Sequence, residues 1–279
     1  MSKYKLDVVI PVLMPSEYLP QMRNYLATIN SNVRINYVLD FMYCKKSDQK
    51  PINNLRANER IITGKFGSPG FARNKALTLC DSKFICFWDV DDCPDVERAS
   101  SFLKQFTGSN ADIGIGSWNY VDKPSRKHGT SVTEVGTSPG IWRFLFKKEF
   151  LERFEFSDLK WGEDQLFLME VFSSEPKILT SGEIIYQYRQ NSPGSLTSQK
   201  RHVMDLFECL KRGVKSFVLS ERNYRKCCGI MLLRQVFSLY KYGGFFLGSK
   251  AFIYLIFNTR AMILNPAVFV RKTTKGMEW

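Results

Sequence analysis

The chain has 279 residues, of which 44% are hydrophobic, 24% charged and 14% aromatic. These proportions exclude an intrinsically disordered protein, and the length is enough for a substantial core in one or two domains. No uncharged run reaches about 18 residues, so no helix is obliged to cross a bilayer. We expect no signal peptide, because the first residues run from charge into a short apolar strand. Seven cysteines without CxxC spacing predict reduced thiols in the cytoplasm.

The net charge of +13 is unevenly distributed along the chain. From Lys200 onward there are 15 Lys and Arg residues against four Asp and Glu residues, a net +11, whereas residues 1–199 carry only +2. A cationic segment of this kind indicates an anionic partner, with nucleic acid, anionic lipid and a phosphorylated acceptor as the candidates.

Apolar runs typical of strands alternate with helical patterns through the first half of the chain. The expected strands are 6–12, 35–40, 61–62, 84–88 and 113–117, and the expected helices are 19–29, 72–79 and 95–106. This alternation predicts an α/β domain with a largely parallel sheet whose faces are covered by helices. Ligands of such sheets bind beyond the carboxyl ends of the strands, where Asp40 and the acidic residues at 89–92 are expected.

The most specific candidate site is Asp89-Val90-Asp91-Asp92, which follows the apolar strand at 84–88. Carboxylates this close repel one another unless a cation or hydrogen-bond donor offsets them, and Mg²⁺ or Mn²⁺ prefers such oxygen ligands. A metal held there could clamp a diphosphate and neutralise its charge. The alternative is an acidic loop that caps the following helix.

A second acidic pair, Glu163-Asp164, follows Trp161-Gly162 and opens an apolar helical stretch. A carboxylate in a partly dry pocket can accept a proton from an attacking hydroxyl. Acidic residues are also favoured in the first turn of any helix by its dipole, so taken alone this pair indicates an ordinary helix N-terminus.

The Gly-rich turn 67–74 also opens a helix, and its Arg73 can pair with a phosphate or a carboxylate. This turn is no Walker loop, because Lys-Ser/Thr is missing. Gly114-Ile115-Gly116 begins like a dinucleotide fingerprint, but Asn119 stands where the third glycine belongs, so that interpretation is rejected.

Taken in order, these motifs resemble the family 2 glycosyltransferases of the bacterial surface-polysaccharide type, over about residues 4–197. The matching features are the opening strand VVIPV, Asp40 closing the second strand, the GxxxARN-like turn at 67–74 with one extra residue, the DxD motif at 89–92, the ED motif at 163–164, the acceptor-side stretch 140–151, and Tyr188-Arg189 with the later 193–197. The resemblance implies a GT-A fold, which is a Rossmann-like and mostly parallel central sheet with flanking helices.

The resemblance also implies roles for individual residues. An inverting transferase would move a sugar from a nucleotide-sugar, a UDP-sugar by expectation, to an acceptor hydroxyl. Asp91 would ligate Mn²⁺ or Mg²⁺, and Asp164 would take the proton of the acceptor. The donor-binding residues would be Pro11, Val12, Asp40, Arg73 and Asp89, and the weaker acceptor-side candidates Trp142, Arg143, Trp161, Glu163 and Arg189.

The chain departs from the family pattern at two places. Val12-Leu13-Met14 replaces the Tyr-Asn or hydroxyl that usually follows the first strand, and Asp40 is followed by Phe41 rather than by an acidic run. Some members add a late His to the metal, where this chain offers Gln190 and Asn191. Base recognition and any further metal ligand are therefore left unassigned.

Residues 200–279 are expected to form a basic helical extension after a catalytic domain at 1–199. Apolar stripes predict helices at 203–217 and 224–241 and a third apolar segment at 245–264. These helices could pack as a lid, or the part at 241–275 could lie on an anionic membrane surface. With a lipid-linked or polysaccharide acceptor, a peripheral position at the cytoplasmic face of the plasma membrane is expected.

Three alternative functions were weighed against a glycosyltransferase, and the sequence disfavours each of them. Nucleic-acid binding through the basic tail is disfavoured because no recognisable nucleic-acid-binding motif accompanies the charge, so no nucleic-acid partner is expected. A sugar nucleotidyltransferase would need a Gly-rich, Arg-containing loop after the first strand, and 11–15 contains neither. A catalytically inactive relative is disfavoured by the carboxylates that the chain retains.

Overall fold

A computed structural model describes residues 3–42, 44, 54–190 and 202–259. The chain forms two compact units, which are described separately. The first consists of Met1–Gly129, Ile141–Phe156 and Lys177–Ser192, and the second of Thr130–Gly140, Ser157–Pro176 and Pro193–Trp279. The expected division between residues 199 and 200 falls within 191–201, which lies outside the described residues, so it stays a prediction.

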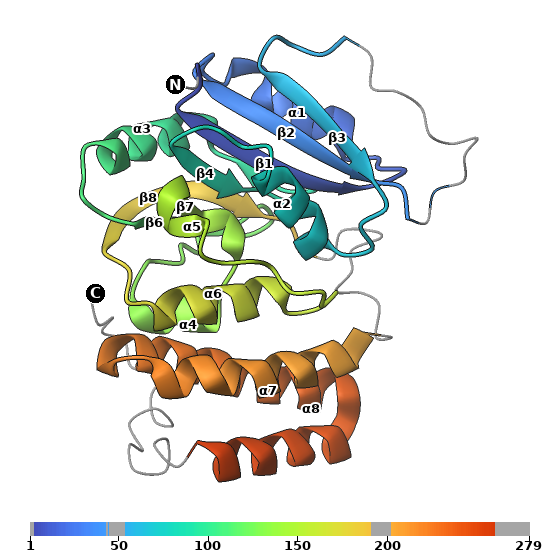
Figure 1. Ribbon diagram of the computed structural model, residues 1–279, viewed down its shortest axis with the longest axis vertical. Helices are drawn as coiled ribbons and strands as arrows, with labels where there is room; N and C mark the ends of the chain where they lie inside the picture. Colours follow the sequence, from blue (N-terminus) through green and yellow to red (C-terminus); the bar gives the residue numbers. More distant parts are fainter. Residues whose placement is uncertain (1–2, 43, 45–53, 191–201, 260–279) are drawn as a thin grey trace. The chain divides into compact units, whose positions relative to one another are not determined.

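The described part of the first unit holds an eight-stranded sheet in the order β3-β2-β1-β4-β7-β6-β8-β5 (Figure 1). Its strands are β1 (Leu6–Leu13), β2 (Val33–Asp40), β3 (Glu59–Gly64), β4 (Phe84–Phe87), β5 (Cys93–Pro94), β6 (Ile113–Tyr120), β7 (Phe144–Lys147) and β8 (Ile178–Tyr188). β1, β2, β3 and β4 run parallel, as do β6 and β8, whereas β7 is antiparallel to β4 and β6. The expected α/β architecture is confirmed, with a sheet of mixed direction.

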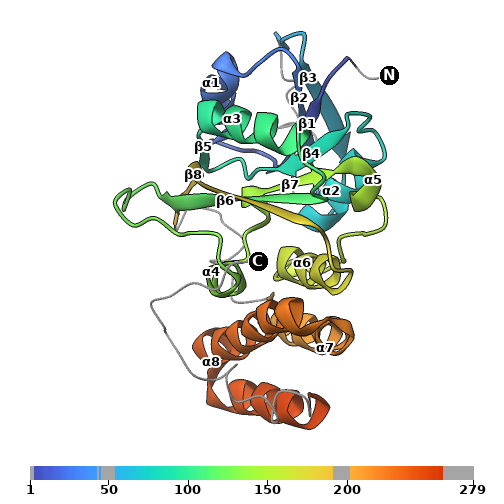
Figure 2. The same cartoon turned by 90° about the vertical axis from the view of Figure 1, so that its left-hand side faces the viewer.

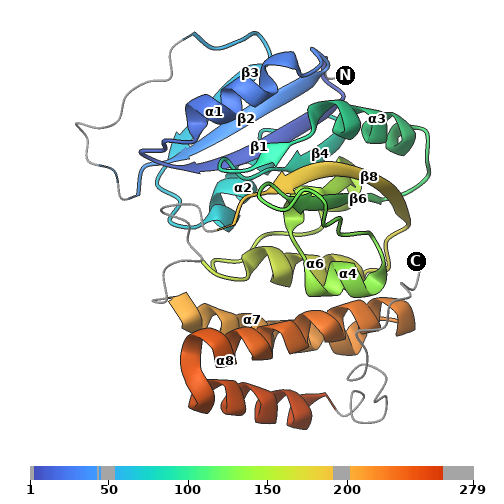
Figure 3. The same ribbon diagram turned by 180° about the vertical axis from the view of Figure 1, so that it is seen from behind.

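Helices cover both faces of this sheet. The helices α1 (Leu19–Tyr25) and α3 (Val96–Thr107) lie on one face, and α2 (Pro69–Leu77) and α5 (Lys148–Leu151) on the other (Figures 2 and 3). α3 begins where the Asp95 carboxylate caps the backbone N–H of Arg98 at 3.0 Å. Its buried face, Phe102 and Phe106 among it, packs into the core, so apolar periodicity and the cap together explain this helix.

The Gly114-Ile115-Gly116 motif lies inside β6, which confirms that it is no phosphate-binding loop. A Cβ at Gly116 would overlap the side chain of Ile185 on β8, and one at Gly114 would press against Phe102 of α3. The absence of a side chain at these two glycines therefore makes room for the side chains of Ile185 and Phe102 to pack against β6.

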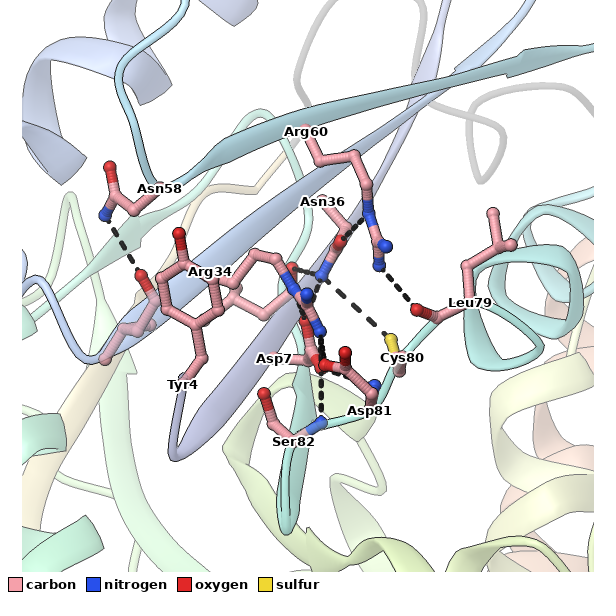
Figure 4. Close-up of polar contacts among 12 residues, drawn as sticks. Tyr4, Asp7, Arg34, Asn36, Asn58, Arg60, Leu79, Cys80, Asp81 and Ser82 are labelled. Atoms are coloured by element: carbon pink, nitrogen blue, oxygen red, sulfur yellow. Dashed lines mark hydrogen bonds and ion pairs between the residues drawn. The ribbon is translucent and has the colours of Figure 1, made fainter. Parts of the chain in front are cut away.

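A buried carboxylate, Asp7, joins β1 to β2 at the end of the sheet where these strands begin. Its oxygens accept hydrogen bonds from the Arg34 guanidinium at 2.6 Å, the Asn36 amide at 2.8 Å and the Ser82 backbone N–H at 3.0 Å (Figure 4). Burial alone would raise the pKa of Asp7, but these donors outweigh it and lower the pKa to about 2. The group is therefore a stabilising ion at neutral pH.

The second unit is helical in its described part, with α4 (Val132–Thr137), α6 (Glu163–Ser173), α7 (Val203–Leu219) and α8 (Arg222–Asn258). α7 confirms the helix expected at 203–217. α8 breaks at Gly244, whose φ of 80° is left-handed, and its second limb runs back along the first (Figure 1). The expected segment at 245–264 is described only as far as residue 259. Among the described helices, none combines the length and the apolar character that a membrane crossing requires.

Candidate active site

Two acidic positions lie at the carboxyl ends of β2 and β4, the two parallel strands that flank β1, as the sequence predicted. Asp40 closes β2 and stands in register with Leu13 of β1 and Gly64 of β3. Asp89 follows the last residue of β4 by two positions, and β4 pairs with β1. Ends of parallel strands are where such sheets bind ligands, so this edge is the candidate active site.

The Asp40 carboxylate organises the loop between β3 and α2. One oxygen accepts hydrogen bonds from the backbone N–H groups of Met42 at 2.9 Å and Phe66 at 3.0 Å, and the other accepts from Gly67 at 2.8 Å. Gly67 has a left-handed φ of 74°, and Ser68 then caps the first turn of α2. Asp40 therefore holds the Gly-rich turn in place through backbone contacts.

α2 delivers Arg73 to the first carboxylate of the acidic motif. The guanidinium donates to the Asp89 carboxylate at 3.0 Å and stacks over the Phe156 ring at 5.3 Å. Arg73 is almost fully buried, while one third of the Asp89 side chain is exposed. The pair brings together two residues that are 16 positions apart. It holds the Asp89 carboxylate in place while part of that carboxylate stays exposed to solvent.

The last carboxylate of the motif, Asp92, points into the core and is held by the end of β8. Its oxygens accept hydrogen bonds from the Tyr186 hydroxyl at 2.8 Å and from the backbone N–H of Arg189 at 2.7 Å. The Arg189 side chain donates in turn to the backbone carbonyl of Asp91 at 2.9 Å. Burial raises the pKa of Asp92 well above its usual range, and the charges of Asp89 and Asp91 raise it further. Asp92 thus anchors the loop from inside.

Asp91 is the carboxylate that these contacts leave available. Within the described residues, no hydrogen bond or ion pair reaches its side chain, and no three His, Cys, Asp or Glu side chains form a metal cage. Mg²⁺ at nucleotide sites is bound through one or two carboxylates together with substrate phosphates. Asp91 and the partly exposed Asp89 beside it could therefore supply some of the ligands of a cation whose other ligands come from a diphosphate. They are too few to form a site in which every ligand comes from the protein.

An aromatic stack fixes the Tyr186 ring. Trp142 lies against Tyr186 with ring centroids 4.7 Å apart and nearly parallel planes, and against Tyr188 at 5.6 Å. Trp142 is buried, and the neighbouring Arg143 is buried with its guanidinium donating to the backbone carbonyl of Gly116 at 3.0 Å. Both acceptor-side candidates are therefore committed to interior contacts in this structure.

The first strand contributes mainly backbone to the candidate site. The Val12 side chain is fully buried and Pro11 is half-buried, so Val12 can face a nucleotide only through its main chain. Tyr18, in the loop after β1, lies close enough to Asp91 to sense its charge. Burial, the nearby Glu17 and then Asp91 raise the pKa of the Tyr18 phenol.

The remaining predicted residues belong to the second unit. Asp164 stands in the first turn of α6, after Gly162 with its left-handed φ of 83°, and one Asp164 oxygen accepts from the backbone N–H of Gln165 at 2.7 Å. Glu163 is buried. Trp161 is also buried, with its ring 5.2 Å from that of Tyr242 on α8, which places it in the packing of this unit.

Sequence reasoning missed Tyr186, Tyr18 and the inward role of Asp92. The run Ile-Ile-Tyr-Gln-Tyr at 184–188, rich in β-branched and aromatic residues, was a recognisable strand signal, and two tyrosines two residues apart on a strand share one face. The residues around Tyr186 in the sequence do not indicate its hydrogen-bond partner, because Tyr186 and Asp92 are 94 residues apart.

No family model matches the chain, and no curated protein matches its sequence. The fold does match solved structures. TarS 1–349 of S. aureus in complex with UDP-GlcNAc superposes with a TM-score of 0.69 at 18% identity, covering 86% of this chain and 74% of TarS 1–349. The same fragment with UDP gives 0.63 at 18% identity over the same shares.

A more distant structure gives the same fold. The mannosyltransferase PcManGT from Pyrobaculum calidifontis, in complex with GDP-Man and Mn²⁺, gives a TM-score of 0.58 at 9% identity, covering 97% of this chain and 82% of the other. The likeness covers most of this chain in each case. The chain therefore has the GT-A fold of these glycosyltransferases.

Proposed function

We propose that this protein is a metal-dependent, inverting glycosyltransferase. Its donor would be a nucleotide-sugar, a UDP-sugar in the first instance, and its acceptor a hydroxyl of a lipid-linked or polysaccharide intermediate in cell-surface glycan synthesis. The observation that carries the proposal is how the three carboxylates of the 89–92 loop are hydrogen-bonded. Asp89 and Asp92 are fixed by Arg73 and Tyr186, while Asp91 is left available at the carboxyl end of the sheet.

The proposed donor site uses the residues of the first unit. Backbone at Pro11 and Val12 would face the nucleotide, and the turn that Asp40 holds would line the site through its backbone. Arg73 holds Asp89 so that its exposed side can meet the ribose or the metal shell. The TarS fragment of this fold was solved with UDP-GlcNAc and with UDP, which supports the uridine assignment.

Asp91 would hold the cation, as Mn²⁺ or Mg²⁺, together with the diphosphate of the donor. When bound, the cation would offset the negative charge that grows on the departing diphosphate. PcManGT was solved with GDP-Man and Mn²⁺, which supports a divalent metal at this fold. Two hydrogen bonds from Arg189, to the Asp92 carboxylate and to the backbone carbonyl of Asp91, would keep Asp91 facing this ligand.

Asp164 is the proposed general base. A positioned carboxylate that takes the proton of the acceptor hydroxyl sharpens the nucleophile, and such groups contribute about 10²–10⁴-fold in rate. The acceptor oxygen would form its bond to the anomeric carbon on the face opposite the bond to the leaving diphosphate, which would give inversion at that carbon. Trp161, Glu163, Trp142 and Arg143 would support the acceptor side indirectly, because all four are buried.

The proposed location is the cytoplasmic face of the plasma membrane. Reduced cysteines agree with it, since none of the seven cysteines forms a disulfide in the structure. A peripheral position would bring the enzyme to a lipid-linked acceptor.

Calorimetric titration of UDP, with Mn²⁺ and again with EDTA, tests the donor and metal assignments together. We expect binding that requires Mn²⁺ and disappears in Asp91→Ala. The matched control is Asp122→Ala, which removes an exposed carboxylate of the same unit and should bind like the wild type. If neither UDP nor GDP binds with Mn²⁺, the proposed donor site is wrong.

A further inference from the structure

The second limb of α8, residues 245–258, has an apolar outer face that no described element of its unit covers. The exposed fractions are 89% for Phe246, 53% for Ile253 and 77% for Phe257. These residues and Lys250 are spaced by four, three and four positions, so they share one face of the helix. Phe245, 73% exposed, lies at the start of the same limb.

The opposite face of this limb accounts for its packing inside the unit. Ala251 and Leu255 are buried, and Gly248 lies against the Tyr240 ring of the first limb. Tyr254 meets Phe207 of α7 with ring centroids 6.0 Å apart, and the hydroxyl of Tyr240 lies 3.2 Å from that of Ser249. α7 and the first limb therefore lie on one side of this segment, and the outer phenylalanines are not needed to hold it (Figures 1 and 2).

The charge of α8 indicates which surface the outer face meets. Residues 222–258 contain six Lys and Arg residues and no Asp or Glu. Lys250 lies at the edge of the apolar stripe, with its ammonium 5.5 Å from the ring centroid of Phe207 on α7, and Lys241 lies just before the turn at Gly244; both are exposed. A second copy of this chain would present the same positive charge to this face, so self-association through it is disfavoured.

We propose that this outer face docks on an anionic lipid bilayer, with Phe246, Ile253 and Phe257 inserted at the boundary between headgroups and acyl chains. Basic residues among aromatic and aliphatic ones suit a helix that lies in the plane of the membrane. Lys241 and Lys250 contact the lipid phosphates, and the apolar side chains leave water. This inference goes beyond the transferase reaction, because lipid binding needs neither donor nor acceptor.

Co-sedimentation of the full chain with lipid vesicles tests the proposal. We expect binding to vesicles of phosphatidylcholine mixed with phosphatidylglycerol, and much weaker binding to phosphatidylcholine alone. The double variant Phe246→Ser/Phe257→Ser should lose at least about tenfold in vesicle affinity. It lacks the two rings whose transfer from water into the bilayer favours binding. Lys241→Gln/Lys250→Gln should lose about tenfold or more, and added salt should weaken the wild type in the same way.

Val218→Ser/Leu219→Ser is the matched control, since it removes two exposed apolar side chains from the end of α7. It should bind vesicles like the wild type. UDP affinity and thermal unfolding are measured on every variant, so a failure of the proposed function is seen separately from a failure of lipid docking. Phe246 and Phe257 are exposed, so their replacement should leave both readouts unchanged.

Three outcomes would overturn the proposal. The first is a wild-type chain that ignores both kinds of vesicle. The second is full vesicle binding by the phenylalanine variant. In the third, that variant unfolds at a clearly lower temperature or loses a dimer seen in sedimentation velocity, which would mean that the chain itself or a second copy covers this face.

Discussion

The hydroxyl of Tyr186 links two residues of the acidic motif. It donates a hydrogen bond to the Asp92 carboxylate at 2.8 Å and accepts one from the backbone N–H of Asp89 at 3.0 Å. Because Trp142 stacks on its ring, the hydroxyl has little freedom to move. Tyr186 is therefore a positioning residue for the loop that carries Asp91, reaching it from the end of β8.

Tyr186→Phe should weaken the loop without unfolding the protein. It removes both hydrogen bonds and keeps the stacked ring, and each such bond contributes about 1 kcal/mol net. We expect the affinity for UDP with Mn²⁺ to fall about tenfold and the Mn²⁺ concentration for half-maximal binding to rise. Tyr188→Phe is the control, because its ring also stacks on Trp142 and the Asp89 and Asp92 contacts remain. A purely structural role would lower the Tm and leave the Mn²⁺ dependence unchanged.

Asp164→Asn tests the proposed base. The amide has nearly the shape of the carboxylate but cannot accept the acceptor proton, so turnover should fall by about 10²–10⁴-fold. Affinity for UDP should be retained. Asp158→Asn removes an exposed carboxylate of the same unit, which pairs with Arg212 at 3.1 Å, and should keep full turnover. Unchanged turnover in Asp164→Asn would remove this residue from the mechanism.

Asp7 should make stability depend on pH in the acid range. Its folded pKa of about 2 lies below the ordinary aspartate value of 3.8, so the unfolded chain binds the proton more readily. The resulting stabilisation, about 2.5 kcal/mol, is fully present above the unfolded pKa and is lost as the pH falls through the folded one. Urea unfolding of the wild type and Asp7→Asn should therefore differ at neutral pH and converge towards about pH 2.

The control for this experiment shares a partner with Asp7. Arg34 also pairs with Asp81, whose side chain is 60% exposed, so Asp81→Asn should change the free energy of unfolding by no more than about 1 kcal/mol. A similar loss in both variants would contradict the assignment of the effect to the buried ion.

Local sequence patterns were sufficient to predict most of the helices and strands in the first half of the chain. The helix at 203–217 was expected from apolar spacing and the buried strand at 84–88 from a continuous apolar run, and the structure has them as α7 and β4. The short β7 was missed because four residues of strand cannot be told from a loop by periodicity. Its antiparallel pairing with β4 and β6 depends on residues far along the chain.

The sequence by itself determined the order of the strands and helices in the first half of the chain, the chemistry of the 89–92 motif and the excess of positive charge after residue 200. Only the tertiary structure decided which carboxylate is free to bind a ligand. Asp89, Asp91 and Asp92 are nearly equivalent in the sequence, but Arg73 from α2 engages the first and Tyr186 from β8 the last. Such contacts join residues that the fold brings together over long separations, and neither composition nor periodicity records which side chains will meet.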